Sequence, residues 1–503
     1  MKNCLIESTK ISRRSFLQAL GALTLSGSLA ACGGTGEAKS DRLAAGSLAY
    51  TPDEVVMVEF SDGGITVSPE DAAGLAVEET ALSVSGAGVY ALSGSCADGS
   101  VKVEAQTEDV VLLLDGLTLT SADTAPIVCG ESTGVTIAVV DGTENTLTDS
   151  EANDPDNAAD NENAEKAVVK CKDGSQVVLC GGGALTVNAL GKNGIKSGTA
   201  LDDRDASLTI RELTLNIEAL VNDAINAEQR LKVESGNLTI AAGEDAIHCD
   251  MELNIGAEDT TGPAITVSTC CEGLEGAVLN IHSGNMDITS TDDCLNAANS
   301  DLGDYAFEIN ISGGTIKAYS SGGDGFDSNG TLTITGGDIS VWTASTADNQ
   351  PLDADGRITI SGGTVLAAGG SAGMGFSISA SQPCVTFGGG RDSSLSLAGG
   401  EAFSIADESG KSVLDSTALC DAAFLFYSSP ALTAEGRYSV QPTVTATAKT
   451  GEADTRFGGN GGPGGSGGQR PDGMTPPDGQ MPQGQLPQSD GTTPPELPAA
   501  SSN

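Results

Sequence analysis

One short phrase recurs across the middle of this chain and constrains its fold more than any other feature. The phrase is an acidic or amide residue, a small residue, a large apolar residue, a polar residue and usually a second small residue. Its apolar anchors, from Ile195 to Phe376, step by 21 to 31 residues. The eight copies begin at Asn193, Asp223, Asp245, Glu272, Asp293, Asp324, Gln350 and Met374. A strand-rich repeat of this length predicts a solenoid, in which each coil buries its apolar face only by stacking on its neighbours.

Each coil reads as three short strands, for example residues 325–328, 332–334 and 338–342. Apolar and polar residues alternate along these runs, as expected for strands with one buried face. Glycine pairs at 313–314, 336–337 and 362–363 mark the same corner in three successive coils. We therefore predict an all-β fold, a right-handed parallel β-helix with irregular terminal coils and a disordered Gly/Pro-rich tail.

The composition changes along the chain and predicts its division into segments. Regular coils are expected over residues 167–382, between an N-terminal cap with entry coils (51–166) and C-terminal coils with a cap (383–448). Residues 33–50 are expected to be a flexible tether, and residues 449–503 a disordered Gly/Pro/Gln-rich tail.

The first 32 residues are expected to be a targeting signal rather than part of the fold. The run Ser12-Arg13-Arg14-Ser15-Phe16-Leu17-Gln18 resembles a twin-arginine export signal, and Leu29-Ala30-Ala31-Cys32 resembles a lipobox. These motifs predict a lipoprotein on the outer face of the cell membrane, with Cys32 as the lipidated residue. An ordinary cleaved signal peptide is the alternative.

The net charge of −45 limits the classes of partner. It opposes nucleic-acid binding, which needs a basic surface, and favours cations or polymers bridged through cations. Solubility of an exported protein is the simpler explanation of the same charge.

Stacking of the phrase would place acids on adjacent coils, about 4.8 Å apart. Such a column of like charges is costly without a positive counter-ion, and hard oxygen donors in stacked loops suit Ca²⁺. The predicted calcium ligands are Glu244, Asp245, Asp292, Asp293, Asp324, Asp327 and Asp353. The alternative is a ladder of turns in which Asp and Asn side chains accept nearby backbone N–H groups.

Aligning the strands places Tyr319 and Trp342 at equivalent positions of adjacent coils, where period-two alternation points them outward. Two exposed aromatic rings side by side would form a platform for sugar rings. The alternative is a cross-strand aromatic pair covered by a loop or a partner.

The phrases GKNGIKSG, VNDAINAE, GEDAIHCD and STDDCLNA follow an upstream DGTENTLTD and precede the Gly/Pro-rich tail. In this order they resemble the β-helical carbohydrate-binding domain of bacterial surface lipoproteins, over about residues 90–380. The resemblance implies a pectate-lyase-like fold that binds calcium and plant-type polysaccharide, with no established catalytic role. Typical copies read D-D-G-I, so Asn193, Gln350 and Met374 are departures, and any metal site should lie in the middle coils.

Three functions remain open from the sequence. The first is calcium-dependent capture of polysaccharide, with an acidic plant-type glycan such as polygalacturonate as the expected partner. The second is a polysaccharide lyase or hydrolase on the same fold. No distinctive Lys or Arg base motif accompanies the acids, so the residues favour a binding role over an enzymatic one. The third is a structural surface protein or adhesin in which calcium only stiffens the stack.

Overall fold

The computed structural model describes residues 43–302, 305–344, 349–370, 377–389, 395–441 and 444–454. Apart from two single-turn 3₁₀ segments, η1 (Pro52–Glu54) and η2 (Glu151–Asn153), every regular element in these residues is a β-strand. The predicted all-β class is therefore confirmed. No helix among these residues is long and apolar enough to cross a membrane.

The strands before the first copy of the phrase are β1 (Leu43–Ala45), β2 (Leu48–Tyr50), β3 (Val55–Ser61), β4 (Gly64–Ser68), β5 (Leu75–Glu78), β6 (Ala81–Val84), β7 (Gly88–Cys96), β8 (Ser100–Val103), β9 (Val110–Thr120), β10 (Ile127–Cys129), β11 (Gly134–Val139), β12 (Glu144–Thr148), β13 (Ala167–Cys171), β14 (Gln176–Gly181) and β15 (Ala184–Asn188). The strands that contain or separate the copies are β16 (Asn193–Ser197), β17 (Ser207–Ile210), β18 (Thr214–Ala219), β19 (Ile225–Ala227), β20 (Arg230–Val233), β21 (Asn237–Ala242), β22 (Ile247–Ile255), β23 (Ala264–Thr269), β24 (Leu274–Ile281), β25 (Asn285–Ser290), β26 (Leu295–Ala297), β27 (Glu308–Ile311), β28 (Thr315–Ser320), β29 (Phe326–Ser328), β30 (Thr331–Ile334), β31 (Asp338–Thr343), β32 (Ile358–Ile360) and β33 (Thr364–Gly369). The remaining strands are β34 (Ser377–Gly388), β35 (Ala402–Asp407), β36 (Ser412–Thr417), β37 (Phe424–Ser428), β38 (Arg437–Gln441), β39 (Val444–Thr447) and β40 (Lys449–Asp454).

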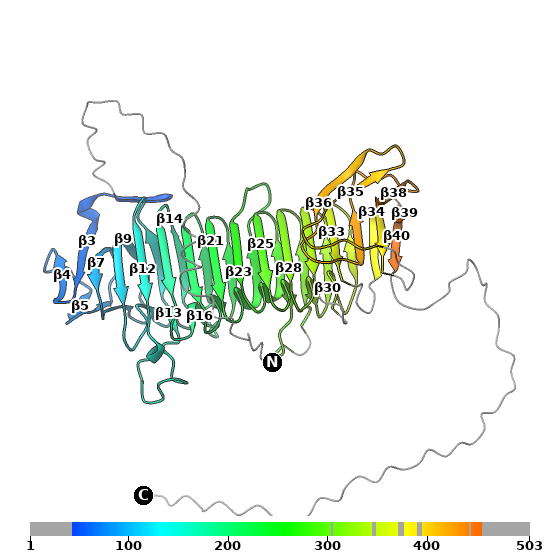
Figure 1. Ribbon diagram of the computed structural model, residues 1–503. Helices are drawn as coiled ribbons and strands as arrows, with labels where there is room; N and C mark the ends of the chain where they lie inside the picture. The colour runs from blue at the N-terminus through cyan, green and yellow to red at the C-terminus, as the bar shows by residue number, and fades with distance from the viewer. Residues whose placement is uncertain are drawn as a thin grey trace, which may run out of the picture. The chain divides into compact units, whose positions relative to one another are not determined.

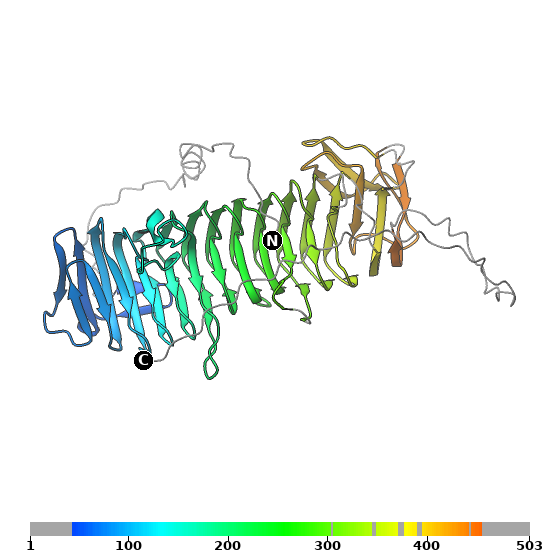
Figure 2. The same cartoon turned by 90° about the horizontal axis from the view of Figure 1, so that it is seen from below.

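Most of these strands pair in parallel with the strand that lies one coil later in the sequence (Figures 1 and 2). The phrase shows the register directly, because Ile195 of β16 pairs with Ile225 of β19, which pairs with Ile247 of β22. We call one such coil, usually three strands, a rung. Equivalent positions of the phrase therefore lie next to each other on successive rungs, about 4.8 Å apart.

The core lies between the strands of each rung and follows the period-two pattern of the sequence. In β30 the side chains of Leu332 and Ile334 are fully buried, whereas Thr331 and Thr333 point outward. The phrase anchor Phe326 is also fully buried. Each such apolar side chain stabilises the fold by about 1.5–3 kcal/mol, so the stack is held mainly by its inward columns.

The predicted glycine corner is present at the start of β28, β31 and β33. Gly314, Gly337 and Gly363 have φ values of +89°, +94° and +78°, a left-handed conformation that a side chain would strain. A Cβ on Gly337 would also stand 3.0 Å from the carbonyl oxygen of Gly314 on the preceding rung. The glycines thus allow the turn and the close stacking at once.

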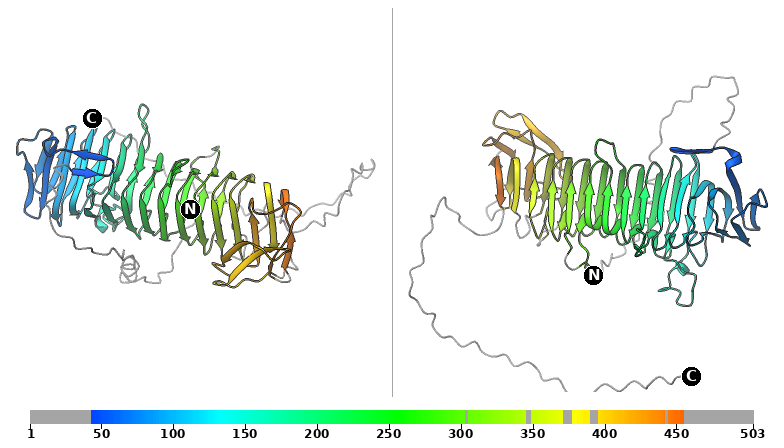
Figure 3. Two further views of the ribbon diagram at one scale, coloured as in Figure 1. Left: turned by 90° about the horizontal axis from the view of Figure 1, so that it is seen from above. Right: turned by 180° about the vertical axis from the view of Figure 1, so that it is seen from behind.

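Antiparallel pairs replace the parallel pattern at both ends of the large sheet (Figure 3). Near the N-terminal end β3 pairs with β4 and β5 with β6, and near the C-terminal end β37 pairs with β33 and β34 while β40 pairs with β34. A separate four-stranded antiparallel sheet, in the order β36-β35-β38-β39, accompanies the last rungs.

Two predicted boundaries differ from the structure. The expected tether 33–50 includes the hairpin β1–β2, whose turn is fixed because the Gly46 N–H donates to Asp141 (2.6 Å) and the Ser47 N–H to Glu212 (2.8 Å). The expected tail 449–503 begins with a strand, β40, that extends the sheet at β34. The targeting motifs, Cys32, the eighth copy of the phrase at Met374 and residues 455–503 lie outside the described residues.

Candidate metal and carbohydrate site

The first residues of the phrase form a column on successive rungs. Within this column, some carboxylates accept hydrogen bonds from the backbone of the next rung. Asp223 Oδ1 accepts the backbone N–H of Asp245 on the next rung at 3.1 Å, and Asp293 Oδ1 accepts that of Asp324 at 2.6 Å. The turn-ladder alternative therefore holds for one oxygen of these carboxylates. The second oxygen of Asp223 accepts a hydrogen bond from Asn226 Nδ2 at 2.7 Å.

Three of the predicted ligands come together beside this column: Asp324 from the first position of the phrase, and Asp327 and Asp353 from its fourth position. Each offers one carboxylate oxygen, and these oxygens lie within 4.8 Å of one another. Burial, with repulsion from neighbouring acids, raises the pKa of Asp324 to about 7 and that of Asp327 to about 6, and it also raises the pKa of Asp353. Among the described residues, no lysine, arginine or histidine forms an ion pair with any of the three.

Two buried side-chain oxygens beside these acids, Asn296 Oδ1 and Gln350 Oε1, have no hydrogen-bond partner among the described residues. Asn296 pairs in register with Asp327, and its Nδ2 donates to Glu272 on the preceding rung at 2.8 Å, so its Oδ1 branch faces away from Glu272. Gln350 is 3% exposed, and its side chain hydrogen-bonds Asp353. An unpaired buried acceptor costs about 1–3 kcal/mol, so two of them at one cluster favour a bound cation.

Two further predicted ligands, Asp292 and Asp293, flank the same point. A Cβ on Gly323 would stand 2.3 Å from Asp292 Oδ1 and 2.5 Å from Asp293 Oδ1, so both carboxylates close over this glycine. Burial raises the pKa of Asp293 to about 8, and the charges of Asp324, Asp327 and Asp292 add to the rise. We call Asp292, Asp293, Asp324, Asp327 and Asp353 the acid cluster.

The predicted ligands Glu244 and Asp245 belong to a different group, three rungs earlier than Asp324. Here His248 Nδ1 lies 3.2 Å from Asp245 Oδ2 and 2.5 Å from Glu275 Oε2, while Nε2 lies 2.8 Å from Asp250 Oδ1. Burial opposes the charged imidazole, but the hydrogen bonds to Asp245, Asp250 and Glu275 outweigh it and raise the pKa of His248 well above its ordinary value. Burial and the charge of Asp245 also raise the pKa of Glu244. This group therefore contains its own cation.

His248 was not among the predicted site residues, although its place in the repeated phrase marks it as equivalent to several of them. His248 holds the fourth position of the phrase, where Asn296, Asp327 and Asp353 stand in later copies. The register places these residues in one outward column on the stack.

The acid cluster has the donor chemistry of a hard divalent cation. Ca²⁺ takes 6–8 oxygen ligands, mostly from carboxylates, carbonyls and side-chain amides. Carboxylates of the cluster and the unpaired amide oxygens of Asn296 and Gln350 are donors of this kind. The raised pKa values of Asp324 and Asp327 have the same origin, because each of these two carboxylates is buried near other acids and pairs with no lysine, arginine or histidine among the described residues.

The predicted aromatic platform is wrong. Tyr319 and Trp342 do pair in register on adjacent rungs, but Trp342 is 0% exposed and Tyr319 is only partly exposed. Trp342 packs edge-on against Phe403 of β35, with ring centroids 6.1 Å apart, and its Nε1 donates to Ser340 at 2.9 Å. Residues of the C-terminal sheet cover this face, so the alternative of a covered aromatic pair is correct.

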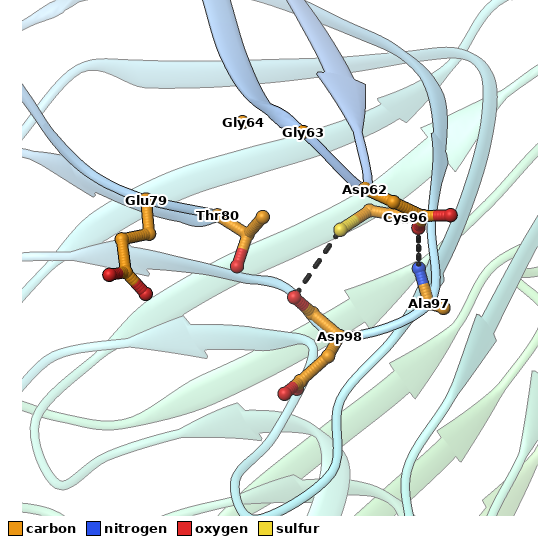
Figure 4. Close-up of a pocket in the computed structure, with 8 residues that line it drawn as sticks. All are labelled: Asp62, Gly63, Gly64, Glu79, Thr80, Cys96, Ala97 and Asp98. Carbon is orange, nitrogen blue, oxygen red and sulfur yellow. Dashed lines mark hydrogen bonds between the residues drawn. The ribbon is translucent and has the colours of Figure 1, made fainter.

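An open hollow of about 470 Å³ lies near the N-terminal end of the sheet (Figure 4) and is lined by Asp62, Gly63, Gly64, Glu79, Thr80, Cys96, Ala97 and Asp98. Asp62 accepts the backbone N–H of Ala97 at 2.8 Å, and Asp98 accepts that of Ala122 at 3.0 Å. Two of its acids thus bind backbone groups, and no aromatic ring lines it. We therefore base the candidate site on the acid cluster.

This chain is similar to proteins described as carbohydrate-binding domain-containing and as polysaccharide lyase-like. A family model described as carbohydrate-binding domain-containing protein matches residues 78–373. A curated protein of the same description from Acetivibrio thermocellus is 30% identical over 184 residues, which are 36% of this chain and 60% of that protein. A solved structure, described as the polysaccharide lyase-like protein from C. thermocellum in a gadolinium derivative, is 23% identical with a TM-score of 0.33. That match covers 61% of this chain and 96% of the other.

Proposed function

This chain belongs to the family of carbohydrate-binding domain-containing proteins, and on that premise we propose that it captures acidic polysaccharide through calcium held at the acid cluster. The observation that carries the proposal is the set of three carboxylate oxygens within 4.8 Å of one another, beside two buried amide oxygens that have no partner among the described residues. The chain matches 60% of the curated relative, so substrate and partners are inferred here from its own residues.

Asp324, Asp327 and Asp353 would hold the ion, with Asp292, Asp293 and the oxygens of Asn296 and Gln350 nearby. Calcium supplies positive charge that carboxylates of the protein and of a uronate polymer can share. Without it, the acid cluster and the net charge of −45 would repel such a polymer. This requirement makes binding calcium-dependent and favours polygalacturonate over neutral glycans. The covered position of Trp342 removes the aromatic surface that the sequence offered for neutral sugar rings.

The proposal extends to the architecture and the location of the protein. We interpret the stacked parallel rungs as a right-handed parallel β-helix, which the one-coil register between successive strands supports. We also propose export and anchoring through Cys32, on the basis of the twin-arginine and lipobox motifs. Anchoring would present the stack to polymer outside the cell.

Calorimetric titration of polygalacturonate into the full-length protein tests the function. We expect saturable heat with calcium and its loss with chelator, and no increase in reducing ends or unsaturated products in the same mixture. The Asp324→Asn and Asp327→Asn variants should lose the calcium-dependent heat.

Asp287→Asn is the matched control, because Asp287 is half-exposed, pairs with Lys317 at 3.0 Å and lies on another face of the stack. Equal binding by Asp287→Asn and Asp327→Asn would contradict the assignment of the site. Accumulation of product would contradict a purely binding role.

A further inference from the structure

A basic island interrupts this acidic chain. Residues 166–196 contain five lysines and one acid, Asp173, and so carry a net charge of +4 in a chain whose total is −45. The lysines are Lys166, Lys170, Lys172, Lys192 and Lys196. They lie on or beside β13 and β16, which are neighbouring strands of adjacent rungs.

Lys170 and Lys196 are direct neighbours, because the parallel register of β13 and β16 pairs them. Lys196 is neutralised, since its Nζ lies 2.8 Å from Glu228 and donates to Asn226 at 2.6 Å. Lys170 is different: no hydrogen bond or ion pair joins its ammonium group to any residue that the structure describes. Burial and the charge of Lys196 lower the pKa of Lys170, while the charges of Glu228 and Glu165 act in the opposite direction. Two like charges on facing positions are destabilising unless an anion lies between or above them.

The neighbouring acidic loop shows which lysines are already matched. Residues 149–165 contain seven acids and no lysine or arginine. Glu165 pairs with Lys172 at 2.6 Å, and Asp156 pairs with Lys192 at 3.2 Å. The loop thus forms ion pairs with Lys172 and Lys192, whereas Glu165 acts on Lys170 only through its charge and leaves it without an ion pair among the described residues.

The lysine pair stands in the same column as Asp327 of the acid cluster. The register runs from Lys170 and Lys196 through Asn226, His248, Glu275 and Asn296 to Asp327. Five rung steps separate Lys196 from Asp327, a distance of about 24 Å at roughly 4.8 Å a step. The column is therefore basic at one end and acidic at the other.

We propose that Lys170 and Lys196 form a second subsite, independent of metal, that binds a carboxylate of the same polyuronate chain. The identity of the polymer rests on the proposed function, whereas the anion subsite rests on the lysine pair alone. A polymer chain laid along the column meets ammonium groups at one end and cation-bridged carboxylates at the other. A chain that spans both subsites gains affinity over a shorter one through effective concentration, and the two ends give it one preferred placement.

Galacturonate oligomers of increasing length, titrated into the full-length protein, test this subsite. In chelator we expect weak binding that Lys170→Gln reduces about tenfold, as for loss of a charge-assisted contact. Lys170→Arg should retain binding, and Lys317→Gln, at a lysine on another face, should leave it unchanged. In calcium, oligomers longer than about 24 Å should bind more tightly than short ones. Lys170→Gln should remove that gain and leave the short oligomers unaffected.

Different results would contradict the lysine subsite and the calcium site. Calcium-dependent binding that is identical in Lys170→Gln and Lys317→Gln, with no chelator-resistant component, would overturn the lysine subsite and leave the proposed function standing. Chelator-resistant binding that depends on Lys170, without any effect of calcium, would support the subsite and overturn the calcium site. Equal affinity for a sulfated polymer in chelator would overturn the assignment to carboxylates.

Discussion

Replacing Asp327 by Asn should have opposite effects on stability with and without calcium. In the metal-free protein the substitution removes one charge from a buried group of acids, so it should stabilise the fold. In the presence of calcium it removes a ligand, so the stabilisation by the ion should be lost. A turn ladder without a metal site predicts no such reversal.

The expected change in the free energy of unfolding follows from the environment of Asp327. Burial, followed by the charges of Asp353 and Asp355, raises its pKa from 3.8 to about 6. At about 1.4 kcal/mol for each pH unit, holding this side chain ionised costs roughly 3 kcal/mol. Relaxation and the cost of burying an amide reduce the expected gain to about 1–3 kcal/mol near neutral pH. Calcium at about 100 times its dissociation constant should stabilise the unmodified protein by about 2.7 kcal/mol.

Thermal unfolding followed by circular dichroism at about pH 8, in chelator and in calcium, measures both effects. Asp287→Asn is again the control and should change little in either buffer, because exposed ion pairs contribute about 0–1 kcal/mol. If Asp327→Asn lowers the melting temperature equally in chelator and in calcium, the side chain acts as a structural hydrogen-bonding group and the reasoning is refuted.

In the metal-free fold the pKa of Asp324 is raised to about 7 and that of Asp293 to about 8, so the stability that these two groups contribute should be greatest below about pH 4 and decline as pH rises through about 8. The calcium-induced rise in melting temperature should therefore be larger at pH 8 than at pH 5. Trp342→Ala should destabilise the C-terminal rungs by about 3–5 kcal/mol, measured by denaturant unfolding, and leave polygalacturonate affinity unchanged; weaker binding at equal folding would contradict the covered position of this ring. Gly325→Ala should lower the melting temperature and weaken calcium binding together, because its Cβ would stand 2.3 Å from the carbonyl oxygen of Pro351, and unchanged calorimetry would show that the rung accommodates it.

The all-β class and the stacking of the phrase could be predicted because both depend on local patterns. Period-two alternation decides which side chains of a strand such as Thr331–Ile334 point inward, and the repeat decides which residues become neighbours. The seven predicted ligands accordingly fall in one region of each rung. Their division into two groups depends on His248, whose charge matters only once Asp245, Asp250 and Glu275 are seen around it.

The aromatic platform could not be judged from the sequence. Alternation correctly places Trp342 on the outward face of its strand, but Phe403 comes from a segment 61 residues later. Nothing local to residues 338–343 indicates that a second sheet covers them. The same limit applies to Lys170, whose lack of an ion pair among the described residues depends on its register with Lys196 and on the ion pairs of the acidic loop.

The antiparallel strands at the two ends of the large sheet also bear on aggregation. A stack of identical parallel rungs ends in open backbone donors and acceptors, and a second copy could add to them as strands add to a growing fibril. Here β37 and β40 pair with β33 and β34 in the reversed direction, and hairpins lie at the opposite end. An incoming molecule cannot continue the parallel register across these pairs. Removal of β40 should therefore expose the edge of β34 and promote end-to-end assembly, which sedimentation at increasing protein concentration would measure.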